Sequence, residues 1–105
     1  ARMGSEHRLR LGDTIMESDS LTVTSHGKRM VLPQKEFMLL YKMASFPGRI
    51  FTRQQLMDEI WGMDAQSDER TVDVHIKRLR EKCEIFPDFS IVTVRGLGYK
   101  AVKNG

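Results

Sequence analysis

The segment from Glu69 to Cys83, ERTVDVHIKRLREKC, constrains the fold of this chain more than any other part of it. Its apolar residues recur at i, i+4, i+7 and i+11, which places them on one narrow stripe of an α-helix at about 100° per residue. They are Val72, Ile76, Leu79 and Cys83. A stripe of this kind predicts a helix over residues 69–83 that packs on a core.

The opposite face of this helix carries Arg70, Lys77 and Arg78, with Val74 among them. Arginine can form two hydrogen bonds to guanine in the DNA major groove, and an apolar side chain can contact a thymine methyl group. A solvated charged face with one stray valine would give the same pattern. The helix alone therefore leaves both interpretations open.

Composition narrows the classes of function. The chain has 105 residues, a formal net charge of +3 and a pI of about 9.3. This length predicts one domain, and the charge favours an anionic partner. No apolar run approaches the ~18 residues of a membrane span. His7, His26 and His75 are scattered and the single cysteine has no metal-binding spacing, so we expect no enzyme, no metal and no cofactor.

The segments before this helix predict a small sheet and two further helices. Leu9 to Leu32 reads as short antiparallel strands, with turns at Gly12-Asp13 and His26-Gly27. Gln34 to Phe46 has helical apolar spacing. Thr52 to Gln55 forms a capping box that opens a second helix, which Gly62 ends. Ser67 or Asp68 is expected to cap the third helix.

The C-terminal segment predicts a β-hairpin. Pro87-Asp88 breaks the chain, Ile91–Val94 is β-prone, Arg95–Gly98 is a turn and Tyr99–Val102 returns. The fold class predicted is α+β: a winged helix-turn-helix with an N-terminal antiparallel β-sheet, three helices and a C-terminal β-hairpin wing. Residues 9–103 form this domain, and residues 1–8, with Met3-Gly4-Ser5, read as a linker or cloning scar.

Four sequence blocks carry a resemblance to a known family. They are KEFMLL (35–40), FTRQQL with IWG (51–62), DERTVDVHIKRLREK (68–82) and TVRGLGY (93–99). In this order and spacing the chain resembles the DNA-binding output domain of OmpR/PhoB-type bacterial response regulators. One departure is Pro33-Gln34, where family members often have Thr-Pro, which puts the cap of the first helix in question.

The resemblance implies the roles of single residues. Arg78 and Val74 would read base edges. Arg95, in the wing at residues 95–98, would enter a minor groove. A minor groove that is narrow and A·T-rich has an enhanced negative potential, which attracts arginine. Phosphate contacts are expected from a further set: Arg70, Thr71, His75, Lys77, Arg53, Trp61, Thr52 and Thr93.

Alternatives remain open for several of these residues. A phosphate contact alone is the alternative for Arg78, and a solvated turn residue is the alternative for Arg95. Lys77 can instead pair with Asp73 or Glu81, each four residues away. Arg80 can pair with Asp73, and His75 can be a satisfied boundary histidine.

The resemblance also implies partners and a setting. It implies double-stranded DNA with direct repeats, a tandem homodimer on that DNA, an N-terminal receiver domain, a sensor histidine kinase and a bacterial cytoplasm. The loop after the second helix would face RNA polymerase; its residues are Met63, Asp64, Ala65, Gln66 and Ser67. A protein-interaction module is the rival from another class, since fold does not dictate function, and a membrane-anchored regulator with the same output domain is a second.

Overall fold

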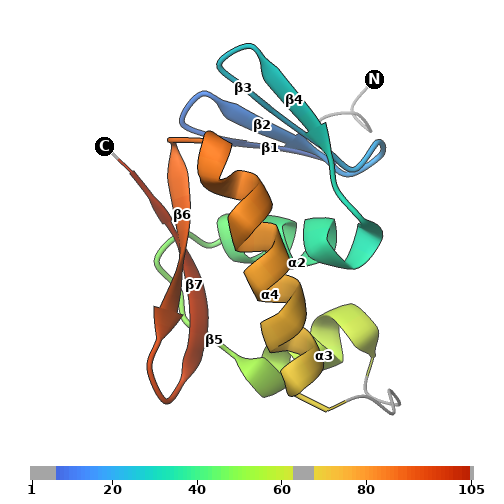
Figure 1. Ribbon diagram of the computed structural model, residues 1–105, viewed down its shortest axis with the longest axis vertical. Coiled ribbons are helices and arrows are strands. Elements are labelled where there is room, and N and C mark those ends of the chain that lie inside the picture. The colour runs from blue at the N-terminus through green and yellow to red at the C-terminus, as the bar shows by residue number, and fades with distance from the viewer. Residues whose placement is uncertain (1–6, 63–67, 105) are drawn as a thin grey trace.

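The computed structural model describes residues 7–62 and 68–104, and confirms the predicted winged-helix architecture. Two antiparallel sheets flank the helices, one of order β1-β2-β3-β4 and one of order β5-β7-β6. The elements in chain order are β1 (Arg8–Leu11), β2 (Thr14–Glu17), β3 (Thr22–Ser25), β4 (Lys28–Val31), α2 (Gln34–Ala44), β5 (Phe51–Thr52), α3 (Arg53–Trp61), α4 (Arg70–Lys82), the 3₁₀ turn η1 (Cys83–Ile85), β6 (Phe89–Val94) and β7 (Gly98–Lys103). Figure 1 shows the first sheet at one end of the molecule and the β6–β7 hairpin beside α4.

The N-terminal sheet forms where the alternating segments predicted it. His26 and Gly27 both have positive φ, as a tight turn between β3 and β4 requires. Its inner face buries Met16 and Val23 completely. The sheet begins before the predicted boundary at residue 9, because Arg8 already pairs with Glu17. The suspected scar at residues 3–5 lies outside the described residues.

The two shorter helices begin as their sequences indicate. Pro33 is the N-cap of α2, where its ring offers no capping acceptor, so the departure from the family pattern leaves this end without a side-chain cap. At α3 the predicted capping box is present: the Thr52 hydroxyl accepts from the Gln55 amide at 3.0 Å, and the Gln55 side chain accepts from the Thr52 amide at 2.8 Å. Gly62 ends α3 with φ of 94°.

Helix α4 buries the predicted apolar stripe. Val72, Ile76 and Leu79 are at most 1% exposed, and Cys83 is 6% exposed at the start of η1. The N-cap of α4 is Glu69, which forms no side-chain capping bond, rather than the predicted Asp68. The Asp68 carboxylate, one residue earlier, still accepts from the Arg70 amide at 3.0 Å. Ser67, the other predicted cap, lies outside the described residues. The helix thus presents one face to the core and its other face outward.

The wing differs from the prediction in the role of one glycine. Gly96, with φ of 79°, makes the turn at the hairpin tip as expected. Gly98 is instead the first residue of β7 and pairs with Thr52 of β5. A Cβ at this position would lie 2.0 Å from the carbonyl oxygen of Phe51, so the lack of a side chain is what allows β5 and β7 to approach.

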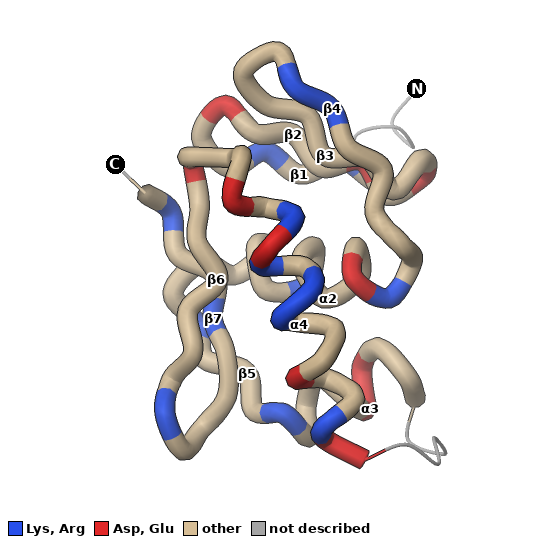
Figure 2. Tube along the Cα trace, in the orientation of Figure 1, with Lys and Arg blue, Asp and Glu red and all other residues tan. Residues whose placement is uncertain are grey.

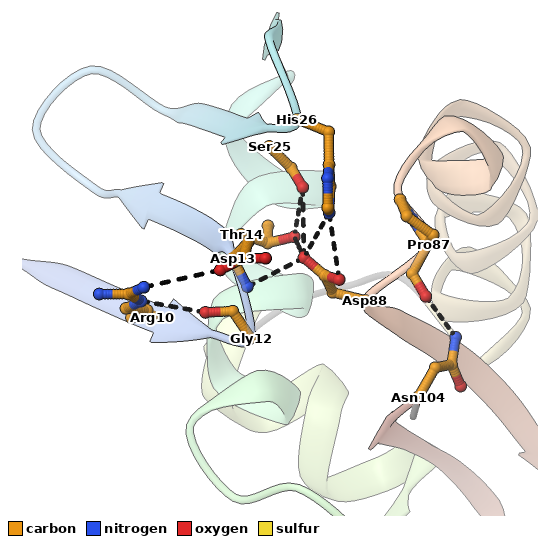
Figure 3. Close-up of polar contacts among 9 residues, drawn as sticks. All are labelled: Arg10, Gly12, Asp13, Thr14, Ser25, His26, Pro87, Asp88 and Asn104. Carbon is orange, nitrogen blue, oxygen red and sulfur yellow. Dashed lines mark hydrogen bonds and ion pairs between the residues drawn. The ribbon is translucent and has the colours of Figure 1, made fainter.

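One carboxylate joins the N-terminal sheet to the turn between η1 and β6. Asp88 Oδ2 accepts from the Asp13 amide at 3.0 Å, the Thr14 hydroxyl at 2.9 Å and the Ser25 hydroxyl at 3.3 Å, and His26 Nε2 lies 3.2 Å away (Figure 3). These bonds explain how two hydroxyl side chains are tolerated in the interior, where an unpaired polar group is costly. We call this set the Asp88 clamp.

Candidate nucleic-acid interface

The outer face of α4 is basic and carries one apolar residue, as predicted. Arg70, Lys77 and Arg78 are exposed, and Val74 is 46% exposed between them. Figure 2 shows basic segments along α4, at the start of α3 and at the tip of the β6–β7 hairpin. Within the described residues, Lys77 has no ion pair, so its predicted alternatives with Asp73 and Glu81 are not formed.

The wing lies beside the N-terminal half of α4. A groove separates the two, and its walls come from both elements and from the start of α3. It is lined by Thr52, Arg53, Glu69, Asp73, Thr93, Val94, Arg95, Gly96, Leu97, Gly98 and Tyr99. The Arg95 side chain and Leu97, which is 56% exposed, stand at the tip of this wing. Helix and wing therefore present residues at the same end of the molecule (Figure 1).

At the start of α4 an acidic side chain, Asp68, lies beside basic ones. The Arg70 guanidinium lies 2.9 Å from Asp68 Oδ2, and this hydrogen bond holds the pKa of the Asp68 carboxyl below its usual range. Both groups are largely exposed, so water screens the pair. Thr71 is half-buried, and its carbonyl oxygen is 2.8 Å from His75 Nδ1.

His75 and Trp61 meet at the boundary between α3 and α4. Their rings lie 4.9 Å apart in an edge-to-face arrangement. Lys35, from α2, donates to the Ile60 carbonyl at 3.0 Å and lies over the Trp61 ring at 5.8 Å. His75 thus has the partners of a satisfied boundary histidine, while its half-buried position leaves an edge toward solvent.

Arg53 is engaged by carboxylates. Its Nη2 donates to Asp73 Oδ2 at 2.9 Å, and its Nη1 lies 3.7 Å from Glu69. The other oxygen of Asp73 accepts from the Tyr99 hydroxyl at 2.6 Å. Burial, and then the bond to Asp73, raise the pKa of Tyr99 to about 12. The Asp73 carboxylate therefore connects α3, α4 and the wing.

The expected pair between Arg80 and Asp73 does not form. Arg80 Nη2 donates instead to the Thr93 hydroxyl at 2.8 Å, and its guanidinium lies 5.9 Å from the Tyr99 ring centre. Asp73 is already occupied by Arg53 and Tyr99, which explains the different choice of partner. Thr93 is exposed on β6, and the bond from Arg80 connects it to α4.

Sequence reasoning missed Tyr99 and Asp73 as members of this site. Tyr99 could have been identified from its position directly after Gly98, since both residues line the groove. Asp73 carries a weaker signal: it is the one acidic residue in the sequence from Arg70 to Arg80, where several basic residues surround it.

Comparison with known proteins identifies the family. Residues 27–101 match the family model described as "Transcriptional regulatory protein, C terminal". The chain belongs to this family. It is the winged-helix DNA-binding output domain of an OmpR/PhoB-type response regulator, a class of transcription regulators rather than enzymes.

Curated relatives support this membership over almost the whole chain. The heme response regulator HssR of Staphylococcus epidermidis is 44% identical over 104 residues, which cover 98% of this chain and 46% of that protein. HssR of Staphylococcus saprophyticus is 50% identical over 91 residues, covering 86% of this chain and 41% of that protein. The chain spans less than half the length of these relatives.

Solved structures agree on the fold. The C-terminal domain of the nisin resistance regulator NsrR superimposes with a TM-score of 0.80 at 26% identity, covering 92% of this chain and 99% of that one. The Klebsiella pneumoniae RstA DNA-binding domain, solved in complex with the RstA box, gives a TM-score of 0.77 at 28% identity, covering 90% and 96%. The part of the chain that the structure describes contains no helix long and apolar enough to cross a membrane.

Proposed function

We propose that this domain binds specific DNA sequences, with α4 in the major groove and the wing in an adjacent minor groove. The observation that carries the proposal is the exposed pair Arg78 and Val74, which stand opposite the buried stripe. An arginine reads guanine through two hydrogen bonds, and a valine contacts a thymine methyl group. Arg95 on the wing supplies the minor-groove contact, which depends on groove width.

Phosphate contacts would supply most of the affinity and its salt dependence. Lys77 and Arg70 are the exposed cations nearest the base-reading pair on α4. Further candidates for phosphate contacts are the polar groups at the borders of this face, on His75, Trp61, Thr52 and Thr71. Arg53 and Thr93 are held by protein partners, so any phosphate contact would use the donors and lone pairs that these bonds leave over.

Further partners follow from the family rather than from these side chains. We propose binding to direct repeats by a tandem homodimer, control by a receiver domain and a sensor histidine kinase, and contact with RNA polymerase in a bacterial cytoplasm. The proposed polymerase loop, residues 63–67, lies outside the described residues. Substitution of Asp64 or Gln66 should leave DNA affinity unchanged but lower transcription in vitro if the protein is an activator.

Selection of bound duplexes from a random pool tests DNA recognition and reveals the site. On that site, Arg78→Ala should weaken binding by about 1–3 kcal/mol and relax the preference at one or two base pairs. Val74→Ala should do less, mainly at a thymine. Arg29→Ala, an exposed arginine on β4, is the charge-matched control. Equal losses of Arg78→Ala on specific and random DNA would reduce Arg78 to a phosphate contact.

The same selection tests the alternative that the sequence alone left open, a module that binds only protein. It decides between DNA binding and this alternative, because such a module enriches no sequence. A protein-binding surface would more often present aromatic or aliphatic anchors than a basic face.

A further inference from the structure

The distance between helix and wing is not fixed by the apolar core alone. Three polar side chains meet below the groove: Arg53 at the start of α3, Asp73 on α4 and Tyr99 on β7. Asp73 accepts from both others, through separate oxygens, at 2.9 and 2.6 Å. Hydrogen bonds from the charged Arg53 guanidinium and the Tyr99 hydroxyl restrict the positions that the Asp73 carboxylate can take.

A second contact between α4 and the wing lies about two helical turns further along α4. Arg80 donates to the Thr93 hydroxyl of β6, and Thr93 pairs with Tyr99 across the hairpin. The Arg80 guanidinium also lies over the Tyr99 ring. Both strands of the wing are thereby attached to α4 through side chains, and the two attachments converge on Tyr99.

The energetics favour a positioning role over a purely structural one. Asp73 and Arg53 are about a third exposed, so water can replace a lost partner at modest cost in stability. Tyr99 itself is 8% exposed and keeps its ring in the core whether or not the hydroxyl is bonded. Removing the hydroxyl should therefore loosen the wing from α4, with the Arg80–Thr93 bond still in place and the fold intact.

We propose that Asp73, bridging Tyr99 and Arg53, sets the separation between α4 and the wing, so that Arg95 reaches the minor groove beside the base pairs read by Arg78. Asp73, Tyr99 and Arg53 are positioning residues in this scheme. The inference rests on the proposed reading of DNA by helix and wing. It adds that the coupling between major-groove and minor-groove readout passes through one carboxylate.

The test begins with Tyr99→Phe on DNA sites in which only the flank is varied between A·T-rich and G·C-rich, at one fixed salt concentration. The flank preference should fall by about two- to tenfold, the range that one such hydrogen bond contributes. The base preferences of α4 should remain. Tyr41→Phe is the matched control, since within the described residues the Tyr41 hydroxyl has no hydrogen bond and its ring stacks on Phe37 in α2.

A double-mutant cycle shows whether Tyr99 acts through Arg95. Tyr99→Phe should have little effect on flank preference once Arg95 is alanine, because the group that it positions is gone. Additive effects, or an unchanged flank preference in Tyr99→Phe, would overturn the proposal. Arg53→Lys, which keeps the charge but loses the planar fork, should give an intermediate loss.

A measurement without DNA separates this inference from the proposed function. Spin labels at Leu97→Cys and Glu81→Cys, both exposed positions, report the distance from wing to α4. Tyr99→Phe should broaden that distance distribution, and an unchanged distribution would sink the positioning role. If the distribution broadens while Arg95→Ala leaves flank preference unaltered in the parent, the wing's groove reading fails and the positioning of the wing stands.

Discussion

A carboxylate from another part of the chain bonds to each of the two sheets of this domain, and the two differ in kind: Asp88 lies in the turn between η1 and β6, and Asp73 lies on α4. Asp88 gathers donors from the N-terminal sheet, mainly neutral groups that include two buried hydroxyls. Asp73 bridges an arginine and a tyrosine at the rim of an open groove. The first satisfies polar groups that water cannot reach, and the second holds two exposed recognition elements at a set distance.

The comparison separates stability from recognition. Loss of the Asp88 carboxylate leaves the buried Thr14 and Ser25 hydroxyls with only the bond between them, so its cost falls on folding. Loss of the Asp73 bridge exposes its partners to water, so its cost falls on the geometry of the DNA-binding face. Variants of the Asp88 clamp should accordingly lower the melting temperature more than the DNA affinity, and variants of the Asp73 bridge should do the reverse.

The largest effect is expected for Gly98→Ala. The added Cβ would collide with the Phe51 carbonyl oxygen, which belongs to the backbone and can move only if β5 and β7 separate. We expect a loss of about 1–3 kcal/mol in the free energy of unfolding, together with a displaced wing. Denaturant titration measures the first, and the flank series measures the second. Gly27→Ala, where a Cβ has open space but φ is positive, separates conformational strain from collision.

Asp88→Asn should come next, with a drop of several degrees in melting temperature and unchanged base preference. The Thr14 hydroxyl, with help from His26 and the Asp13 amide, lowers the pKa of the Asp88 carboxyl from its usual 3.8. A lowered carboxyl pKa gives stability that is present above the usual value and is lost as pH falls through the folded value. The parent should therefore lose stability on acidification below about pH 4 more steeply than the variant.

Asp19→Asn, which changes an exposed carboxylate in the turn between β2 and β3, is the control for that experiment. Thermal unfolding between pH 3 and pH 7 gives both curves. Parallel curves for the parent and Asp88→Asn would remove the clamp from the account of acid stability.

A smaller effect is expected for Lys77→Ala. Its ammonium group is exposed and unpaired within the described residues, so its loss should leave stability unchanged. As a phosphate contact it should lower the slope of log affinity against log salt by about one. Lys28→Ala removes the same charge from β4 and should leave the slope as it was. A slope that stays constant for Lys77→Ala would place this lysine outside the interface.

The smallest effect concerns Cys83, at the junction between α4 and η1. Burial, with Glu36 nearby, raises the pKa of its thiol to about 12. The thiolate is the reactive form, so alkylation at pH 8 should be negligible in the native protein and complete after denaturation. A raised thiol pKa gives stability that is present below the usual 9.0 and is lost as pH rises toward 12. Rapid native labelling, followed by mass spectrometry, would show that this end of α4 opens.

The sequence predicted what repeats at short range and missed what joins distant residues. The stripe on α4, the capping box at Thr52 and the turn at His26-Gly27 each depend on neighbours within a few positions, and all three are present. The clamp joins Asp88 to residues 62–75 positions away, and the bridge joins Arg53 to Asp73 20 positions away. Such contacts leave no periodic trace in a sequence.

The candidate site divides in the same way. The exposure of Arg78, Val74 and Lys77 follows from helix periodicity alone. The partner of Arg80 could not be predicted, because the wing strand that offers Thr93 approaches α4 only in the folded protein. The sequence pattern places Gly98 in the turn, because β5, the strand that pairs with it, has only two residues and gives no recognisable strand pattern.

The two faces of α4 have no residue in common, and this has a consequence for how operator preference can diverge. The inward stripe of Val72, Ile76 and Leu79 carries the packing, whereas Val74, Lys77 and Arg78 on the outward face are exposed. Changes at 74, 77 and 78 can therefore accumulate, or be introduced by design, without rebuilding the interior. A family of regulators with one scaffold and many target sites is the outcome that such a helix permits.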